Sequence, residues 1–406
     1  MVRKARTPTP DRTVLNDPAH RQVLRLALAQ VLFMTASVMV ATVGSLAGSR
    51  IASSPTWATF PVAAMLLGSA AMTIPASLWM ARVGRRNGFL AGAFLGVLGG
   101  LVAALGVTLS SLALLALGTL LVGAYQAFAQ FYRFAAGEVS NAAFRPRAIS
   151  LVLAGGVIAA FTGPLLARWG GPLLPDHLYA GSFLILALVS LLAMGLLRGV
   201  RVPAPTVADL AGPKRSWSEI ARQPTYLVAL FGAATGLGVM VLAMTATPIA
   251  MAHHHHGLDA SATVIQLHVL GMFVPSFFTG SLIARYGVLP VMFAGVLLLG
   301  GHVVGALSGT GFSDFATALV LLGVGWNFLY IGGTTLLTGT YTPAEKSKAQ
   351  AINDMTVSAV GLVCSFSAGG LLAALGWAKM NALLLPWLVV TGAAIGWLGW
   401  RRRRID

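Results

Sequence analysis

The sequence predicts an all-α polytopic membrane protein, and three observations support this fold class. Hydrophobic residues make up 57% of the 406-residue chain and charged residues only 9%, with a mean hydropathy of +0.81. Soluble domains carry about 25% charged residues, so this chain has too few polar side chains to cover a surface that faces water. Long apolar runs recur along the chain, and lysines and arginines gather in alternate loops between them. Together these features indicate helices that cross a bilayer many times.

Apolar runs of about 20 residues, the length that crosses a bilayer as a helix, occur twelve times. They are continuously apolar rather than alternating, which favours helices over barrel strands. A polar stretch divides them into two sets of six. The first set is 23–48, 57–80, 88–109, 112–136, 147–168 and 178–198, and the second is 225–251, 260–284, 288–309, 313–338, 350–375 and 379–400.

The basic residues predict how the chain sits in the membrane. All but four of the 27 lysines and arginines lie in the tails or in the loops of one side, the exceptions being Arg50, Arg133, Arg168 and Lys379. Cytoplasmic loops are enriched in such residues, so we expect a multi-pass protein of the bacterial inner membrane with both termini in the cytoplasm. The net charge of +16 is then a topology signal, and we expect the lipid bilayer but no nucleic acid as a partner.

The stretch 199–224 is the one long polar segment between runs. It predicts a cytoplasmic tail (1–22), a six-helix bundle (23–198), a cytoplasmic linker (199–224), a second six-helix bundle (225–400) and a basic tail (401–406). An internal repeat agrees, because the motif Ala-Arg-x-Gly at 81–84 recurs at 284–287, an offset of 203 residues. Many secondary transporters are built from two parallel repeats of this kind.

This organisation, with the Arg-x-Gly-Arg-Arg turn at 82–86, resembles the major facilitator superfamily over essentially the whole chain. The resemblance implies twelve transmembrane helices in two six-helix bundles and transport by alternating access. It also suggests Arg82 and Arg285, in the two repeated turns, as candidate gating residues, although the family usually has an aspartate where Ala81 stands. The sequence has no phosphate-binding loop for ATP, so we expect a carrier driven by a gradient, not an enzyme, acting as a monomer without a cofactor.

Methionine and histidine recur at helical spacing in the seventh and eighth runs. Met240 and Met244 share one helical face, as do His268 and Met272, because residues four apart are neighbours on a helix. Counted from the outer surface, Met244 lies as deep as His268 and Met240 as deep as Met272, about 12 and 18 Å at 1.5 Å per residue. An antiparallel hairpin would gather these donors near the midplane, where carriers bind substrate.

Thioether sulfur is a soft ligand that suits Cu(I), so the four residues predict a copper site, although methionine also packs well in apolar helices. The two pairs resemble the CcoA-like copper importers, as do the stretches 325–328, 332–337, 349–354 and 133–138. The resemblance implies import of copper, as Cu(I), to support cbb3-type cytochrome oxidase biogenesis. A periplasmic copper donor and a cytoplasmic copper chaperone would be its partners, and copper its substrate rather than a cofactor.

The alternative is a major facilitator carrier of a small organic solute, either riboflavin-like or a drug for efflux. Relatives of the copper branch that lack the Met/His pairs are thought to carry solutes such as riboflavin. Such a carrier would show an aromatic-lined cavity, for which Tyr125, Phe128 and Trp326 are candidates.

Four consecutive histidines follow the seventh run and predict a site for metal capture, with a solvated polar loop as the alternative; they are His253, His254, His255 and His256. The repeat offset places Met34 opposite Met240 and Met65 opposite His268. These two methionines are candidate ligands from the first half, with packing as their default role.

Charges inside membrane spans are costly and therefore functional or paired. Arg133 and Glu138 lie in the fourth expected helix, with Glu138 just past the end of its apolar run, and Asp354 lies in the eleventh. The two carboxylates could carry coupling protons. We favour a structural role for all three residues.

Overall fold

The computed structural model describes residues 18–53, 57, 60–203, 215–256 and 258–404, and all regular structure in these ranges is helical. The first half contains α1 (Pro18–Ile51), α2 (Phe60–Val83), α3 (Arg85–Thr108), α4 (Leu112–Ala129), α5 (Tyr132–Glu138), α6 (Arg145–Gly170), the short η2 (Gly171–Leu173) and α7 (Ala180–Leu197). The second half contains α9 (Trp217–Ala221), α10 (Pro224–His253), α11 (Leu258–Phe273), α12 (Ser276–Tyr286), α13 (Val288–Ser308), α14 (Phe312–Leu337), α15 (Lys346–Ala382) and α16 (Leu384–Arg403).

The all-helical membrane fold expected from the sequence is confirmed. Within the described ranges, eleven helical segments are long and apolar enough to cross a membrane. The last of these, Lys346–Arg403, contains two of the expected spans, because the backbone breaks at Gly376, where φ is 73°. The described residues therefore supply twelve spans. The other expected break, at Ser110 and Ser111, is also present, with Ser111 capping the start of α4.

Two spans differ from their expected form because each is interrupted. The fourth is divided into α4 and α5 around Gln130 and Phe131, and the eighth into α11 and α12 around Val274 and Pro275. Proline has no backbone N–H to donate, which loosens a helix at that point. The twelfth span begins slightly before its expected start, because the chain is helical again from residue 377 to Ala382, and a turn at Leu383 separates this piece from α16.

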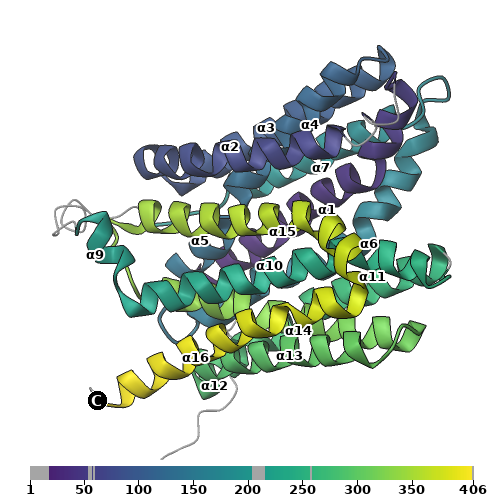
Figure 1. Cartoon of the computed structure of the whole chain (residues 1–406). Helices are drawn as coiled ribbons and strands as arrows, with labels where there is room; N and C mark the ends of the chain where they lie inside the picture. The colour runs from purple at the N-terminus through teal and green to yellow at the C-terminus, as the bar shows by residue number, and fades with distance from the viewer. Residues whose placement is uncertain (1–17, 54–56, 58–59, 204–214, 257, 405–406) are drawn as a thin grey trace, which may run out of the picture.

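The helices pair in the same order in the two halves. In the first half α4 packs against α2 and α3, α1 against α6, and α3 against α7. In the second half α14 packs against α11 and α13, α10 against α15, and α13 against α16. Figure 1 shows most of the purple and blue helices of the first half above the green and yellow helices of the second.

The repeated Ala-Arg-x-Gly turns adopt the same backbone conformation. Gly84 has φ 86° and ψ 158°, and Gly287 has φ 89° and ψ 162°. Each glycine caps the start of the next helix, α3 or α13. Only glycine adopts such a positive φ without a steric penalty from a Cβ. The repeat seen in the sequence is thus a repeat of structure.

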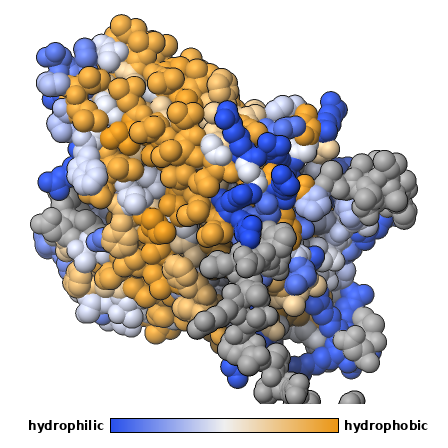
Figure 2. Space-filling model, turned by 180° about the vertical axis from the view of Figure 1, so that it is seen from behind, coloured by the Kyte–Doolittle hydropathy of each residue, from blue (hydrophilic) through white to orange (hydrophobic). Residues whose placement is uncertain are grey.

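The surface and the helix ends are consistent with a membrane setting. Figure 2 shows a broad apolar band between polar ends, and large side chains such as Phe366, which is 83% exposed, project from the helices. The short helix α9 and the C-terminal end of α16 lie at the same end of the bundle (Figure 1). We call this end the basic side, because Arg86, Arg145 and Arg285 lie on helix ends there.

The two halves contact each other through α2 with α15 and through α6 with α11 and α12. The backbones come closest at Gly280 of α12. A Cβ on this glycine would lie 2.6 Å from Arg147 Cα and 2.6 Å from the carbonyl oxygen of Pro146. The neighbouring Ser150 hydroxyl donates to the carbonyl oxygen of Ser276 and accepts from Gly280 N–H. The halves are therefore tightly joined at the basic side.

Candidate substrate site between the halves

The candidate metal donors are mostly buried. Met240 of α10, His268 and Met272 of α11 are all less than 10% exposed, and Met244 is half-buried. His268 Nδ1 donates to the carbonyl oxygen of Leu319 in α14, at 2.8 Å. Because a carbonyl can only accept, the neutral ring carries its lone pair on Nε2. This Nε2 is buried and has no hydrogen-bond partner among the described residues.

The two Met/His helices do not form the expected antiparallel hairpin. Both α10 and α11 pack extensively along α14 and only slightly against each other. Gly323 of α14 allows this, because the backbone of His268 and Met272 lies directly against it. The hairpin expectation is wrong because a third helix packs against both donor-bearing helices. A copper site made of Met240, Met244, His268 and Met272 stays a prediction.

The four histidines lie at the end of α10 and just beyond it. His253 is the last residue of the helix, His255 has a left-handed backbone with φ 60°, and all but His256 are exposed. His256 Nε2 donates to the carbonyl oxygen of Thr310 at 2.7 Å, and its ring lies edge-on to Phe315. Within the described ranges, no three His, Cys, Asp or Glu residues are grouped so that they could hold a metal ion. His256 thus has a structural contact, and metal capture by the tract stays a prediction.

The candidate methionines of the first half pack among apolar side chains. Met34 is half-buried against the main core that also contains Met240 and Met272. Met65 is 7% exposed and belongs to a separate core of the first half, with Met39 and Phe183. A ligand role for Met34 and Met65 stays a prediction.

The three intramembrane charges form ion pairs. Arg133 of α5 pairs with Asp354 of α15 at 2.5 Å, and this pair crosses between the halves. Arg133 also donates to the hydroxyl of Tyr330 on α14, and Asn353 Nδ2 donates to Asp354 Oδ1. The two charged side chains are 4% and 2% exposed. Such burial is tolerable only because each charge is neutralised by a close partner.

Glu138 is the centre of a second cluster at the basic side. It pairs with Arg85 of α3 at 2.8 Å and with Lys346 of α15 at 3.0 Å. Arg85 also donates to Gln350 Oε1 of α15 at 2.5 Å. Sequence reasoning missed Arg85 and Lys346 as functional residues, although Arg85 belongs to the Arg-x-Gly-Arg-Arg turn. The cluster joins the two halves at the basic side, where α3 and α15 begin and α5 ends.

The other two candidate gating residues lie outside this network. Arg82 and Arg285 are exposed, and neither forms an ion pair with a described residue. The Arg285 guanidinium lies over the ring of its neighbour Tyr286, 5.2 Å from the centroid. A gating role for Arg82 and Arg285 stays a prediction, and the contacts between the halves are made by Arg85 instead.

An aromatic row lies beside the Arg133–Asp354 pair. The rings of Trp326 and Tyr330 on α14 are stacked, with centroids 5.0 Å apart and an interplanar angle of 16°. Phe273 of α11 meets Trp326 edge-on at 5.9 Å, and Arg133 lies 4.6 Å from the centroid of the Tyr330 ring. The indole Nε1 of Trp326 is buried without a hydrogen-bond partner among the described residues.

The aromatic row faces the first half of the molecule. Phe273 packs against Gly156 of α6, and Tyr330 receives a hydrogen bond from Arg133. Of the aromatic residues considered from sequence, only Trp326 belongs to the row. Tyr125 and Phe128 pack edge-on against Phe33 and Trp79 within the first half. Tyr330 and Phe273 were missed, because no local pattern distinguishes them from other aromatic residues in membrane helices.

Polar contacts between the halves extend from the basic side towards the middle of the bundle. Among the described residues, every hydrogen bond that crosses between the halves uses a residue in the basic-side half of its helix. One of them joins Ser77 Oγ of α2, as the donor, to the carbonyl oxygen of Ser347 of α15 at 2.7 Å. The two halves are closed against each other on one side, as in one state of an alternating-access carrier.

Two six-helix halves joined by ion pairs at one end define a polytopic secondary transporter. The model of the Major Facilitator Superfamily matches residues 26–267, more than half of the chain. The chain belongs to the major facilitator superfamily, and the expectation from the repeated turn is confirmed.

Relatives and solved structures agree with this family. The chain is 40% identical over 372 residues to the riboflavin transporter RfnT of Brucella anthropi, covering 91% of this chain and 93% of the relative. It is 30% identical to the uncharacterized MFS-type transporter YddS of Bacillus subtilis, covering 88% of this chain and 84% of that one. The crystal structure of the transporter FucP in the outward conformation matches with a TM-score of 0.71 at 17% identity, over 92% and 97% of the two chains. The narrower resemblance to copper importers stays a prediction.

Proposed function

We propose that this protein carries a planar aromatic organic solute of the flavin class, riboflavin itself in the first instance, across the bacterial inner membrane. This is the alternative to copper raised from the sequence. The observation that supports it is the stacked Trp326–Tyr330 pair beside the buried Arg133–Asp354 pair. The relative that is 40% identical and named a riboflavin transporter points to the same class of solute.

The chemistry of the cluster fits such a solute. An isoalloxazine ring is flat and apolar on its faces, and aromatic side chains bind such faces by offset or edge-on stacking. Its edge carries carbonyl and N–H groups, which suit nearby polar atoms such as the unpartnered Nε1 of Trp326. In this arrangement Trp326 and Phe273 would contact the ring, and Arg133 and Asp354 would hold the two halves in register.

Substitution of Trp326 tests the assignment. We expect Trp326→Ala to weaken riboflavin binding about fivefold to tenfold, since an aromatic contact contributes about 1 kcal/mol beyond its buried area. Equilibrium dialysis of the purified protein with radiolabelled riboflavin measures this. Trp397→Ala, which removes an exposed indole from α16, is the matched control and should bind as the wild type does. Equal affinity of the Trp326→Ala and wild-type proteins would contradict the site.

Copper is the second candidate substrate, and one observation favours it. The buried Nε2 of His268 on α11 carries a lone pair with no described partner. Thioether sulfurs lie on the same helix, at Met272, and on α10, at Met240. If copper is carried, Met240→Ala combined with His268→Ala should abolish copper uptake and leave riboflavin uptake unchanged.

For either substrate, our proposal places both termini in the cytoplasm and treats the protein as a monomer.

A further inference from the structure

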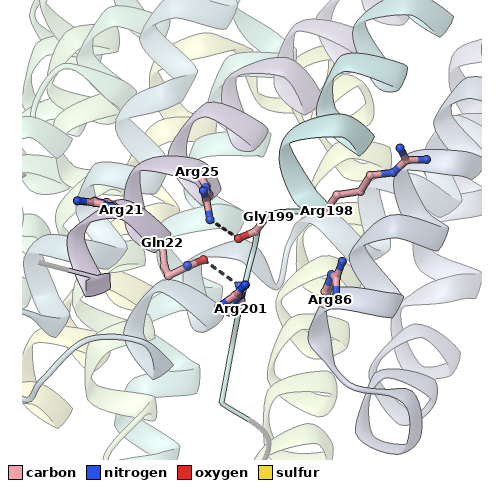
Figure 3. Close-up of a pocket in the computed structure, with 7 residues that line it drawn as sticks. All are labelled: Arg21, Gln22, Arg25, Arg86, Arg198, Gly199 and Arg201. Carbon is pink, nitrogen blue, oxygen red and sulfur yellow. Dashed lines mark hydrogen bonds between the residues drawn. The ribbon is translucent and has the colours of Figure 1, made fainter. Parts of the chain in front are cut away.

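A cavity of about 370 Å³ on the basic side is lined almost entirely by arginine (Figure 3). Its lining comes from the start of α1, the start of α3 and the chain that leaves α7. The seven lining residues are Arg21, Gln22, Arg25, Arg86, Arg198, Gly199 and Arg201. No carboxylate is among them. Five arginines around one cavity create a strongly positive site.

Two side chains of α1 are fixed against the chain that follows α7. Arg25 Nη1 donates to the carbonyl oxygen of Gly199, and Gln22 Oε1 accepts from Arg201 N–H at 2.8 Å (Figure 3). The Arg25 guanidinium also lies closely against Gly199, where a Cβ would be 3.0 Å from Arg25 Cζ. These two contacts fix part of the lining through backbone atoms of Gly199 and Arg201.

Three of the other guanidinium groups are available to a ligand. Within the described ranges, the side chains of Arg86, Arg198 and Arg201 form no hydrogen bond or ion pair, and all three are exposed. Guanidinium remains charged at any physiological pH and binds phosphate through two parallel N–H donors. Several unpaired arginines around one cavity therefore select an anion with phosphate oxygens.

An apolar track leads away from this cavity along α7. The exposed side of the helix runs through Leu184, Leu188, Leu192 and Gly195 to Arg198, positions that recur every three or four residues and so share one face. A Cβ on Gly195 would meet no atom within 4 Å, so the surface there is open. The cavity thus lies at the border between the polar end of the bundle and its lipid-facing surface.

We propose that this cavity binds the phosphate of an anionic phospholipid whose acyl chains lie along the exposed face of α7. Basic pockets between membrane helices bind anionic headgroups in this way. A soluble phosphate would use the arginines alone, whereas a lipid needs the apolar track as well. This second requirement distinguishes the two sources.

Native mass spectrometry of the purified protein with added lipid tests the proposal. Dioleoyl phosphatidylglycerol and cardiolipin are the anionic probes, and dioleoyl phosphatidylcholine is the zwitterionic control. We expect the wild type to retain the anionic lipids preferentially. The triple variant Arg86→Ala, Arg198→Ala and Arg201→Ala should lose retention by about tenfold or more. A matched triple variant, Arg82→Ala with Arg222→Ala and Arg403→Ala, removes three exposed arginines of the basic side outside the cavity and should retain lipid.

Two further comparisons make the test decisive. Leu188→Gln with Leu192→Gln should weaken retention of phosphatidylglycerol, because it interrupts the apolar track. Unchanged retention in the cavity triple variant, or equal loss in both triple variants, would overturn the site. Displacement of the lipid by millimolar sodium phosphate, with no effect of the leucine changes, would assign the cavity to a soluble anion instead. Should the triple variant not fold, Arg198→Ala alone removes a side chain without described partners and serves the same comparison.

Discussion

At the scale of single residues, the pairing of Arg133 with Asp354 is the feature that ties the two halves together most deeply. The residues are 221 positions apart, and the sequence showed only that each is a charge inside a membrane span. Because a single charge inside a membrane span is costly, each of the two was expected to have a partner. Nothing in the local sequence identified that partner. Glu138 behaves in the same way, because its partners Arg85 and Lys346 come from α3 and α15. Charges could thus be recognised from sequence as important, while their contacts required the fold.

Breaking the Arg133–Asp354 pair should be more harmful than removing it. We expect Asp354→Asn to destabilise the protein by about 3–5 kcal/mol, since it leaves the Arg133 charge buried and uncompensated. Combining it with Arg133→Gln should recover most of that loss. Thermal unfolding of the detergent-purified variants measures the difference. A single variant as stable as the wild type would show that water reaches this pair.

The ion pair of Arg215 with the buried Glu345 gives a prediction on pH. Arg215 donates to both carboxylate oxygens of Glu345, at 2.9 and 2.6 Å, and these bonds lower the pKa of Glu345 from 4.5 to about 2. A carboxyl with a lowered pKa stabilises the fold above pH 4.5, and this contribution is lost as the pH falls towards 2.

The variant Glu345→Gln should therefore differ from the wild type at pH 7 and become indistinguishable from it at low pH. Because Arg215 is partly exposed, we expect a difference of about 1 kcal/mol or less at pH 7. Thermal midpoints between pH 7 and pH 2 provide the measurement. Asp176→Asn, which changes an exposed carboxylate without a described partner, controls for net charge. A difference independent of pH would contradict the ion-pair explanation.

At the scale of helices, periodic and uninterrupted features could be predicted from sequence. Each of the twelve apolar runs corresponds to a span, and the repeated glycines Gly84 and Gly287 have matching backbones. The interruptions near Gln130 and Pro275 were not predicted, because hydropathy continues across them. The packing of α14 against both α10 and α11 was also missed, since neighbours in sequence were taken to be neighbours in space. This error affects the copper hypothesis directly, because that hypothesis relied on a hairpin.

The close contact of α6 with α12 predicts how one glycine controls the closed side. Leucine at Gly280 would collide with the backbone of Pro146 and Arg147, so Gly280→Leu should force the basic side open. In a Cys364→Ala background, Ser77→Cys reports this opening, because Ser77 is fully buried in the contact. We expect maleimide to label the cysteine at position 77 several-fold faster in the Gly280→Leu protein than in the protein that keeps Gly280.

Gly369→Leu is the matched control for this experiment. A Cβ on Gly369 of α15 would meet no atom within 4 Å, so the substitution should leave labelling at the wild-type rate. If Gly280→Leu and Gly369→Leu label equally slowly, the α6–α12 contact does not hold the halves closed.

At the scale of the whole molecule, the sequence predicted the architecture because a membrane imposes strong and regular patterns. Apolar length, the distribution of basic residues and the repeated turn all describe the carrier as a class, and the family assignment agrees with them. The solute is a different matter, because it depends on a few side chains brought together from distant helices. Met240 and His268 were prominent by their residue type, whereas Trp326, Tyr330 and Phe273 became prominent only when the fold stacked them together.

Side-by-side uptake of riboflavin and copper by proteoliposomes tests the central claim most directly. The protein would be reconstituted as wild type, as Trp326→Ala, and as Met240→Ala combined with His268→Ala, with radiolabelled riboflavin or radiocopper supplied under an imposed proton gradient. We expect the wild type to move riboflavin and the Trp326→Ala protein to do so with a KM raised about fivefold to tenfold. The Met/His variant should move riboflavin normally. Copper uptake that requires Met240 and His268, with no movement of riboflavin by the wild type, would contradict the account.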